Sequence, residues 1–141
     1  MTKFDIRWKQ RFANYKNAHG RLKSALAFFE RTCGDNADEY IAVEALIKCF
    51  EFTFELAWQT MKDFVSYQGA GRTINGSRDS IRCAAQFELI ANVEIWMDMV
   101  DDRNRASHAY DETSARALVG RIAECYRGEF EKFEEKMETL P

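Results

Sequence analysis

The stretch DDRNRASHAYDE, residues 101–112, contains side chains that together can do acid–base chemistry on a phosphate ester. Arg103 and Asn104 are followed by His108, one of only two histidines in the chain. A histidine whose pKa is near neutrality can take the 2′-hydroxyl proton of RNA or protonate a leaving 5′-oxygen. An arginine can hold the phosphate and stabilise the charge of the transition state. Because RNA carries its own nucleophile, this chemistry needs no metal ion.

The same stretch also fits an ordinary charged helix end. In that interpretation the helix dipole favours His108 near the C-terminus of a helix. Arg103 then pairs with a nearby carboxylate, that of Asp98, Asp101 or Asp102. The residue types alone do not separate this interpretation from a catalytic one.

Helical geometry limits how Arg103 and His108 can act together. On a regular α-helix, residues five apart are separated by about 140° and by about 7.5 Å along the axis, so these two do not share a face. Asn104 and His108, four apart, do share one. A joint site therefore needs the arginine to reach around the helix, the helix to loosen near His108, or a second copy of the chain to complete it. This geometry favours a dimeric site.

Two glutamates in the aromatic stretch CFEFTFELAW, Glu51 and Glu55, are candidates for supporting such a site. A carboxylate on the buried side of a helix needs a cationic partner. Arg103 or Arg105 is the natural candidate, so a glutamate of this helix can orient the arginine. In the alternative interpretation, both glutamates lie on an exposed stripe between the apolar positions.

The elements that carry these residues are expected to be helices. Apolar residues recur at intervals of three and four, and no segment alternates with a period of two. The only proline is the last residue, so none interrupts a helix. We expect helices over about 5–32, 38–67, 77–90, 93–100 continuing into the opening stretch, and 111–137. The expected N-caps are Ser77, Asn92 and Asp111. The sequence predicts an all-α fold, an up-and-down bundle of four to five helices in one domain covering 1–141.

Composition places the chain among ordinary folded proteins. Apolar residues make up 46% and charged residues 30%, and the net charge of −3 argues against a surface that binds nucleic acid all over. No apolar run approaches the roughly 20 residues of a membrane span, and no secretory segment is visible, so we expect a cytoplasmic protein without a membrane partner. The cysteines and histidines are scattered, so we expect no metal and no cofactor.

Charge is distributed unevenly between the two ends of the chain. Residues 1–23 carry seven Lys or Arg against one Asp, and residues 129–138 carry five Glu against two Lys. The two terminal helices either pack side by side with complementary charge, or the basic one docks an acidic partner or RNA. A few apolar residues left over on the long helices are candidates for self-association, namely Phe28, Phe52 and Tyr126.

Three separated segments resemble one known family in the right order. The segments FEFTFELAW, SRDSIRCAAQFELI and DDRNRASHAYDE are similar to the nucleotidyltransferase substrate-binding family, which consists of small all-α proteins within the HEPN superfamily. The resemblance covers about residues 38–126. It implies a four- or five-helix bundle that often dimerises.

The resemblance also implies roles for individual residues. The family's R-x4-6-H motif lines a metal-independent ribonuclease site, and Arg103, Asn104 and His108 occupy its positions. In the HepT-like branch encoded beside a minimal nucleotidyltransferase, the motif extends to R-x4-H-x-Y, and Tyr110 stands at the tyrosine. There the helical protein is a toxin, which the partner neutralises by binding and by adding adenylate groups to that tyrosine.

Two functional hypotheses follow from the resemblance. The first is the HEPN toxin component of a toxin–antitoxin pair, a dimeric endoribonuclease controlled by a separate minimal nucleotidyltransferase. The second is a non-catalytic subunit of a two-chain nucleotidyltransferase, in which the same residues hold a substrate or nucleotide. The G-S-x-A-x-G signature of the transferase is absent from this sequence, so the chain is not expected to transfer nucleotides by itself.

Overall fold

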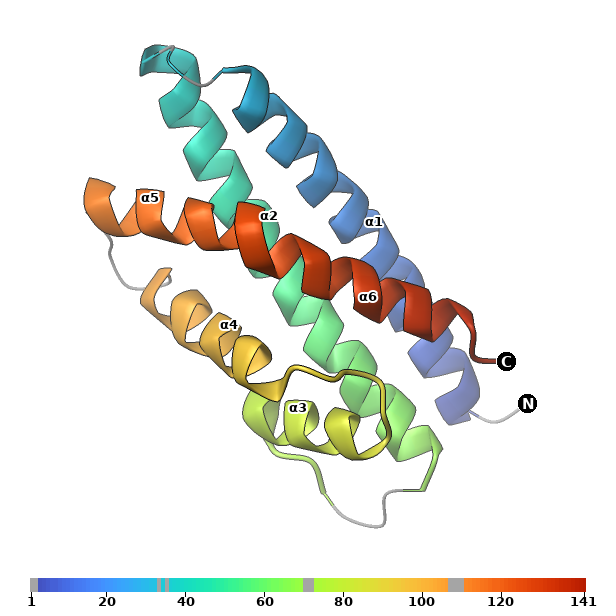
Figure 1. Ribbon diagram of the computed structural model, residues 1–141. Helices are drawn as coiled ribbons and strands as arrows, with labels where there is room; N and C mark the ends of the chain where they lie inside the picture. Colours follow the sequence, from blue (N-terminus) through green and yellow to red (C-terminus); the bar gives the residue numbers. More distant parts are fainter. Residues whose placement is uncertain (1–2, 33, 35, 70–72, 107–110) are drawn as a thin grey trace.

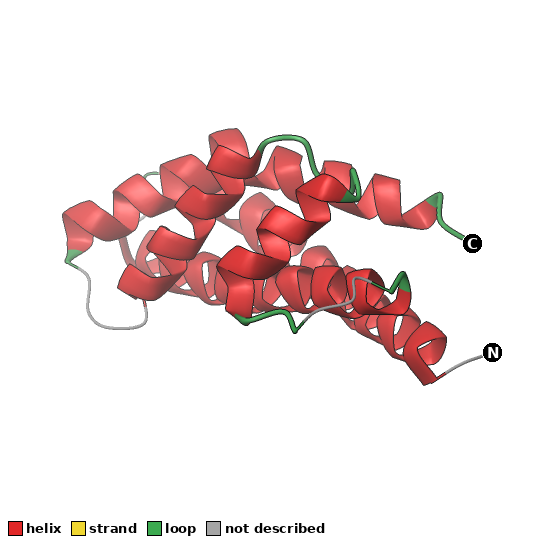
Figure 2. Cartoon of the chain, turned by 90° about the horizontal axis from the view of Figure 1, so that it is seen from below, coloured by secondary structure: helices red, strands yellow, loops and turns green. Residues whose placement is uncertain are grey.

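A computed structural model describes residues 3–32, 34, 36–69, 73–106 and 111–141, and over these residues it contains helices and no strand (Figures 1 and 2). The elements are α1 (Lys3–Arg31), α2 (Asn36–Tyr67), α3 (Gly76–Gln86), α4 (Val93–Ala106), α5 (Glu112–Arg121), a π-helical turn (Ile122–Tyr126) and α6 (Arg127–Glu138). The predicted all-α class is confirmed. Both long N-terminal helices begin and end within two residues of the predicted bounds.

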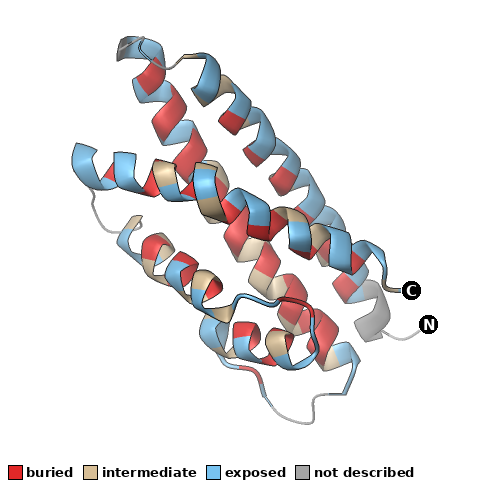
Figure 3. Ribbon diagram, viewed as in Figure 1, coloured by how far each residue is buried: buried red, intermediate tan, exposed pale blue. Residues whose placement is uncertain are grey.

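The helices α1 and α2 run antiparallel, side by side, and form the longest contact of the fold (Figure 1). Trp8 of α1 meets Phe64 of α2 edge to face, with ring centroids 5.1 Å apart. Figure 3 shows the buried residues of α1 in a stripe that recurs along one side of the helix. This stripe follows from apolar residues spaced three and four apart, which place one apolar face against the neighbouring helix.

The helices α5 and α6 are joined by the π turn into one continuous rod that crosses the α1–α2 pair obliquely (Figure 1). The prediction of one long helical run at this end of the chain is confirmed, but its π turn was not expected. Aromatic side chains of the rod fill the core. Phe130 meets Trp96 of α4 edge to face at 5.6 Å, and Tyr126 stacks on Phe50 of α2 at 5.5 Å.

The bounds of α3 differ from the prediction at both ends. Asn75 is the N-cap residue, and its backbone N–H donates to the Asp79 carboxylate at 2.9 Å. Ser77, the predicted N-cap, lies inside the first turn. The helix stops at Gln86 rather than at Ile90, and Glu88 turns the chain with φ 61°. Leu89 and Ile90 are buried, but from the loop that follows the helix. Their apolar character therefore extended the predicted helix too far.

The start of α5 agrees with the prediction. Asp111 is its N-cap, and its carboxylate accepts the Ser114 backbone N–H at 2.7 Å. Asn92 precedes α4, and its carbonyl accepts the N–H groups of Ile95 and Trp96. The Asn92 side chain instead donates to Glu129 of α6 at 2.9 Å.

Complementary charges join the two terminal helices, as one of the two interpretations predicted. Lys16 and Lys23 of α1 pair with Glu138 and Glu131 of the C-terminal helix at 3.1 and 3.3 Å. Of the three residues considered for self-association, Phe52 is 56% exposed and Phe28 is half-buried. Tyr126 was wrongly placed at the surface, since its ring lies in the core against Phe50.

Along the described ranges, no helix is both long enough and apolar enough to cross a membrane. Among the same residues, no group of three or more His, Cys, Asp or Glu side chains is arranged to hold a metal ion. Cys49, Cys83 and Cys125 are free thiols on the helices.

Candidate functional site

Arg103 lies in the last turn of α4 and faces Glu55 of α2. Its Nη2 is 3.7 Å from Glu55 Oε2, and both side chains are about one third exposed. Of the pairings that the sequence left open, between Glu51 or Glu55 and Arg103 or Arg105, the structure shows Glu55 with Arg103. Asn104 is exposed, while His108 and Tyr110 lie outside the described residues. A partly exposed guanidinium next to a carboxylate is oriented by that carboxylate and can still meet an anion from solvent.

Glu55 is itself held by its own helix. Its two carboxylate oxygens accept hydrogen bonds from Trp58 Nε1 and Gln59 Nε2, each at 3.1 Å. Gln59 in turn accepts a hydrogen bond from Arg11 of α1. These donors restrict the rotamer of Glu55 and so fix the position from which it contacts Arg103.

The other two supporting residues have different partners from those considered. Glu51 lies 4.0 Å from Lys48 on its own helix. Arg105 donates to Asp102 at 3.0 Å, one turn back along α4. Of the two glutamates, Glu55 therefore contacts the motif from another helix, through Arg103. Arg105 instead pairs with Asp102 of its own helix.

Sequence reasoning missed a buried cluster directly beside the motif. Asp102, only 2% exposed, accepts two hydrogen bonds from Arg121 of α5, from Nε at 2.8 Å and from Nη2 at 2.7 Å. The hydroxyl of Tyr126, at the end of the π turn, donates to the same carboxylate. With Arg105, four donor groups from three side chains surround one carboxylate. Such a carboxylate can stay ionised in the interior because its lone pairs are satisfied.

The electrostatics of this cluster follow from burial and hydrogen bonding. Burial raises the pKa of Asp102, but the hydrogen bonds from Arg121, Tyr126 and Arg105 outweigh it and hold the pKa below its ordinary value. Burial and then the Asp102 hydrogen bond raise the pKa of Tyr126 well above that of a free tyrosine. Hydrogen bonding to Asp102 raises the pKa of Arg121. The cluster is therefore a carboxylate, a guanidinium and a neutral phenol over the whole physiological range.

The π turn explains how Arg121 and Tyr126 reach the same carboxylate. In an α-helix, residues five apart point about 140° away from each other. In a π-helix the hydrogen bonds run from residue i to i+5, which brings residues five apart onto one side. The signal in the sequence was Arg121 and Tyr126 within the stretch ALVGRIAECY. Sequence reasoning gave Arg121 no role and placed Tyr126 among the candidates for self-association.

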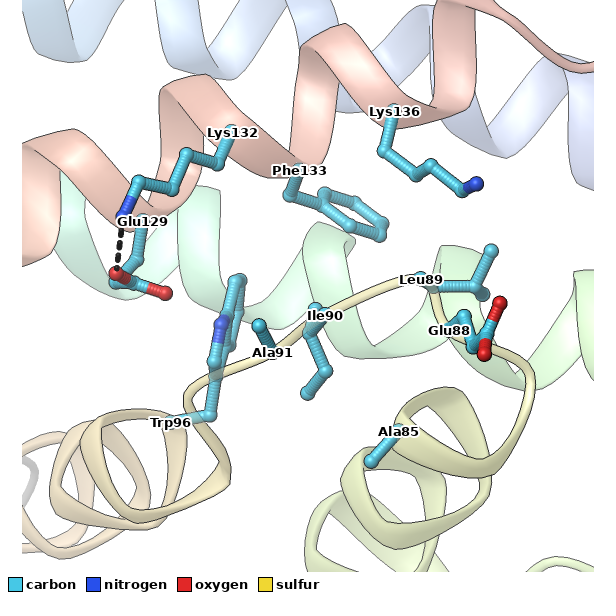
Figure 4. A pocket seen from close by; sticks show the side chains of 10 residues that line it. All are labelled: Ala85, Glu88, Leu89, Ile90, Ala91, Trp96, Glu129, Lys132, Phe133 and Lys136. Carbon is cyan, nitrogen blue, oxygen red and sulfur yellow. Dashed lines mark hydrogen bonds and ion pairs between the residues drawn. The ribbon is translucent and has the colours of Figure 1, made fainter.

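Hollows in the surface lie on different sides of this site. One of about 330 Å³ lies between α4 and α5 and is lined by Asp102, Arg105, Ala106, Ser114, Ala115, Ala117, Leu118 and Arg121. Another, of about 480 Å³, lies between α6 and the loop before α4, with Trp96 and Phe133 at its wall and Lys132 and Lys136 beside it (Figure 4). Neither Arg103 nor Asn104 lines either hollow, although Asp102 and Arg105, on either side of them in the sequence, line the first. A third hollow, of about 490 Å³ between α1 and α2, is lined in part by Glu55, the partner of Arg103.

Comparison with known proteins identifies the family. The sequence profile described as "nucleotidyltransferase substrate binding protein like" matches residues 10–139. The chain belongs to this family. A relative described as the probable ribonuclease HepT of Haemophilus influenzae is 33% identical over 85 residues. That segment is 57% of this chain and 57% of the relative, so the match spans little more than half of that protein.

Solved structures share the fold of this family member. A Haemophilus influenzae protein, described as having the fold of a substrate-binding domain of a nucleotidyltransferase, aligns with a TM-score of 0.80 and 23% identity over 90% of this chain and 98% of that one. The tri-AMPylated HEPN toxin of Shewanella oneidensis, in complex with its MNT antitoxin, aligns with a TM-score of 0.73 and 20% identity over 99% of this chain and 100% of that one. At these identities the likeness establishes the shared fold.

Proposed function

We propose that this chain is a metal-independent endoribonuclease, the HEPN toxin of a two-chain system whose second chain is a minimal nucleotidyltransferase. The observation that carries the proposal is the Arg103–Glu55 pair, 3.7 Å apart, at the end of the helix that leads into the R-x4-H-x-Y motif. Family membership and the resemblance to a probable ribonuclease support it.

In the proposed reaction the motif residues have separate tasks. Arg103, directed by Glu55, holds the scissile phosphate and stabilises its added charge. His108 acts as the general base that takes the 2′-hydroxyl proton and as the acid that protonates the leaving 5′-oxygen. Asn104 positions the RNA. The products are a strand with a 2′,3′-cyclic phosphate end and a strand with a free 5′-hydroxyl. The reaction therefore uses no water and requires no metal ion.

Tyr110 is the proposed control point. An adenylate group on its phenolic oxygen places bulk and a negative phosphate two residues from His108. Repulsion between this phosphate and the RNA backbone lowers the affinity for substrate. The tri-AMPylated toxin among the structural neighbours supports this form of control.

We infer that the active form is a homodimer. Ile41 and Phe52 of α2 are 58% and 56% exposed, and residues eleven apart on an α-helix lie within about 20° of each other. Two large apolar side chains on one exposed face favour association. Analytical ultracentrifugation of the wild type and of Phe52→Glu tests this inference. We expect the wild type to be a dimer and Phe52→Glu to be a monomer. A monomeric wild type would contradict the inference.

A second function is favoured by the family description itself. As a substrate-binding subunit, the chain would hold a nucleotide or substrate for the partner's active site without cutting RNA. The structure described as a substrate-binding domain of a nucleotidyltransferase supports this alternative.

Incubation of the purified chain with RNA in EDTA separates the two functions. The ribonuclease proposal expects cleavage that persists in EDTA and is lost in His108→Ala and Arg103→Ala. Absence of cleavage by the wild type, together with nucleotide binding that requires the partner chain, would establish the binding subunit instead. Mass spectrometry of the chain after co-expression with the partner tests Tyr110, with Tyr110→Phe as the control that takes up no adenylate.

A further inference from the structure

Asp102 joins the two helices on either side of the segment that carries His108 and Tyr110. It lies one residue before Arg103, near the end of α4, and Arg121 is the last residue of α5. Two parallel N–H···O bonds connect them, at 2.7 and 2.8 Å. A bidentate guanidinium–carboxylate pair restrains orientation as well as distance. The relation between the end of α4 and the rod of α5 and α6 is therefore held at this point.

Tyr126 adds a second tie from the same rod. Its hydroxyl donates to Asp102 while its ring stacks on Phe50 of α2 at 5.5 Å, with 1% of the residue exposed. The phenol is thus anchored in the core and contacts the carboxylate from a fixed position. The π turn allows this arrangement, since it brings Arg121 and Tyr126 to one side of the rod.

Two neighbouring residues of α4 are held by different elements of the fold. Asp102 is bound from the rod, and Arg103 is bound from α2 through Glu55. Adjacent positions on an α-helix point about 100° apart, so ties at both positions prevent the last turn of α4 from rotating. Rotation of this turn is the motion that would carry Arg103 away from a phosphate.

We propose that Asp102, Arg121 and Tyr126 form a positioning clamp, which orients the last turn of α4 and the adjoining helix so that Arg103 and His108 act on one phosphate. The inference rests on the proposed ribonuclease function. It is needed because Arg103 and His108 do not share a face of a regular helix, so their relation depends on how the flanking helices are held. None of the three clamp residues touches the reacting atoms in this scheme.

The test compares two tyrosines that each lose one buried hydroxyl. Tyr126→Phe removes the hydrogen bond to Asp102, and Tyr15→Phe removes a hydrogen bond of 2.7 Å to the Phe130 carbonyl, between α1 and α6. We expect Tyr126→Phe to lower kcat for RNA cleavage at least tenfold with little change in KM. Tyr15→Phe is matched to it in chemistry and burial. When each protein is assayed the same number of degrees below its own Tm, we expect Tyr15→Phe to cleave RNA at the wild-type rate.

Asp102→Asn provides a second variant of the clamp. It preserves the size of the side chain but removes the charge that Arg121 requires, so kcat is expected to fall further than in Tyr126→Phe. Circular dichroism and Tm of this variant test whether the fold is retained. If Asp102→Asn does not fold, Tyr126→Phe alone decides the proposal.

An NMR readout makes the proposal independent of cleavage. The chain has two histidines, so the imidazole signals of His19 and His108 are resolved and assigned by substituting one of them. We expect Tyr126→Phe to shift the His108 signals and to leave the His19 signals unchanged. Tyr15→Phe is expected to shift the His19 signals and not those of His108, since Tyr15 stacks on His19 at 5.6 Å.

The outcomes separate the clamp from the ribonuclease. If the wild type cleaves and Tyr126→Phe matches Tyr15→Phe in kcat and in the His108 signals, the clamp is wrong and the ribonuclease stands. If the wild type does not cleave, yet Tyr126→Phe shifts the His108 signals selectively, the ribonuclease is wrong and the clamp still positions the motif. No cleavage and no selective shift overturn both.

Discussion

Two adjacent residues at the end of α4 have opposite surroundings. Arg103 is partly exposed, so its guanidinium contacts both the Glu55 carboxylate and solvent. Asp102 is buried among donors from three side chains. The first arrangement suits a group that must meet an anion from outside. The second suits a group that must not move. At the residue scale, the motif therefore begins with an arginine that is open to solvent and follows a fixed, buried aspartate.

The Glu55–Arg103 contact is the part of the site that substitution tests most directly. Glu55→Gln keeps the hydrogen-bonding shape but removes the charge that directs Arg103, so we expect kcat for RNA cleavage to fall about tenfold. Glu51→Gln is the matched control, because Glu51 lies one turn earlier on α2 and contacts Lys48. Steady-state cleavage rates of both variants measure the effect, and equal rates would remove Glu55 from the site.

At the scale of elements, the rod of α5 and α6 combines a core-filling face with the π turn. Ile122, Tyr126, Phe130, Phe133 and Met137 are buried at spacings of four, four, three and four, which an ordinary α-helix also satisfies. The apolar pattern therefore predicted the rod but carried no sign of the π turn. The turn brings Arg121 and Tyr126 to the carboxylate of Asp102, which comes from a different helix.

Glycines in this rod offer a test of helix propensity. A Cβ at Gly128 would meet no atom within 4 Å, and the residue is exposed in α6. Gly128→Ala is expected to raise the free energy of unfolding by about 0.5 to 1 kcal/mol, because alanine loses less backbone entropy in a helix.

Gly76→Ala is the control for this prediction. Gly76 also has open space around it, but its φ of +79° strains any residue with a Cβ. We expect it to lower the free energy of unfolding by about 1 kcal/mol. Urea denaturation of both variants gives the two signs, and a stabilising Gly76→Ala would contradict the assigned backbone conformation.

For the whole molecule, the buried Asp102 links stability to pH on the acid side. Because its pKa is lower in the folded than in the unfolded chain, the unfolded state binds its proton first as the pH falls. The stabilisation is complete above the ordinary carboxyl pKa of about 4 and is lost as the pH drops through the folded value.

Asp102→Asn cannot titrate at this position. We expect it to be less stable than the wild type at neutral pH, with a difference that narrows as the pH falls below about 5. Unfolding free energies at several pH values measure this convergence. Parallel curves for the two proteins would show that Asp102 has its ordinary pKa in the fold.

Periodicity and composition were sufficient for the all-α class, for the long helices α1 and α2, and for the Asp111 cap, because each depends on residues near one another in the chain. The Arg103–Glu55 pair was one of several pairings that the sequence left open, between Glu51 or Glu55 and Arg103 or Arg105, beside an exposed position for both glutamates. The clamp was not foreseen. Burial of a charged side chain depends on donors that arrive from elsewhere in the chain, so the role of Asp102 emerged only once α4 and the rod were packed together.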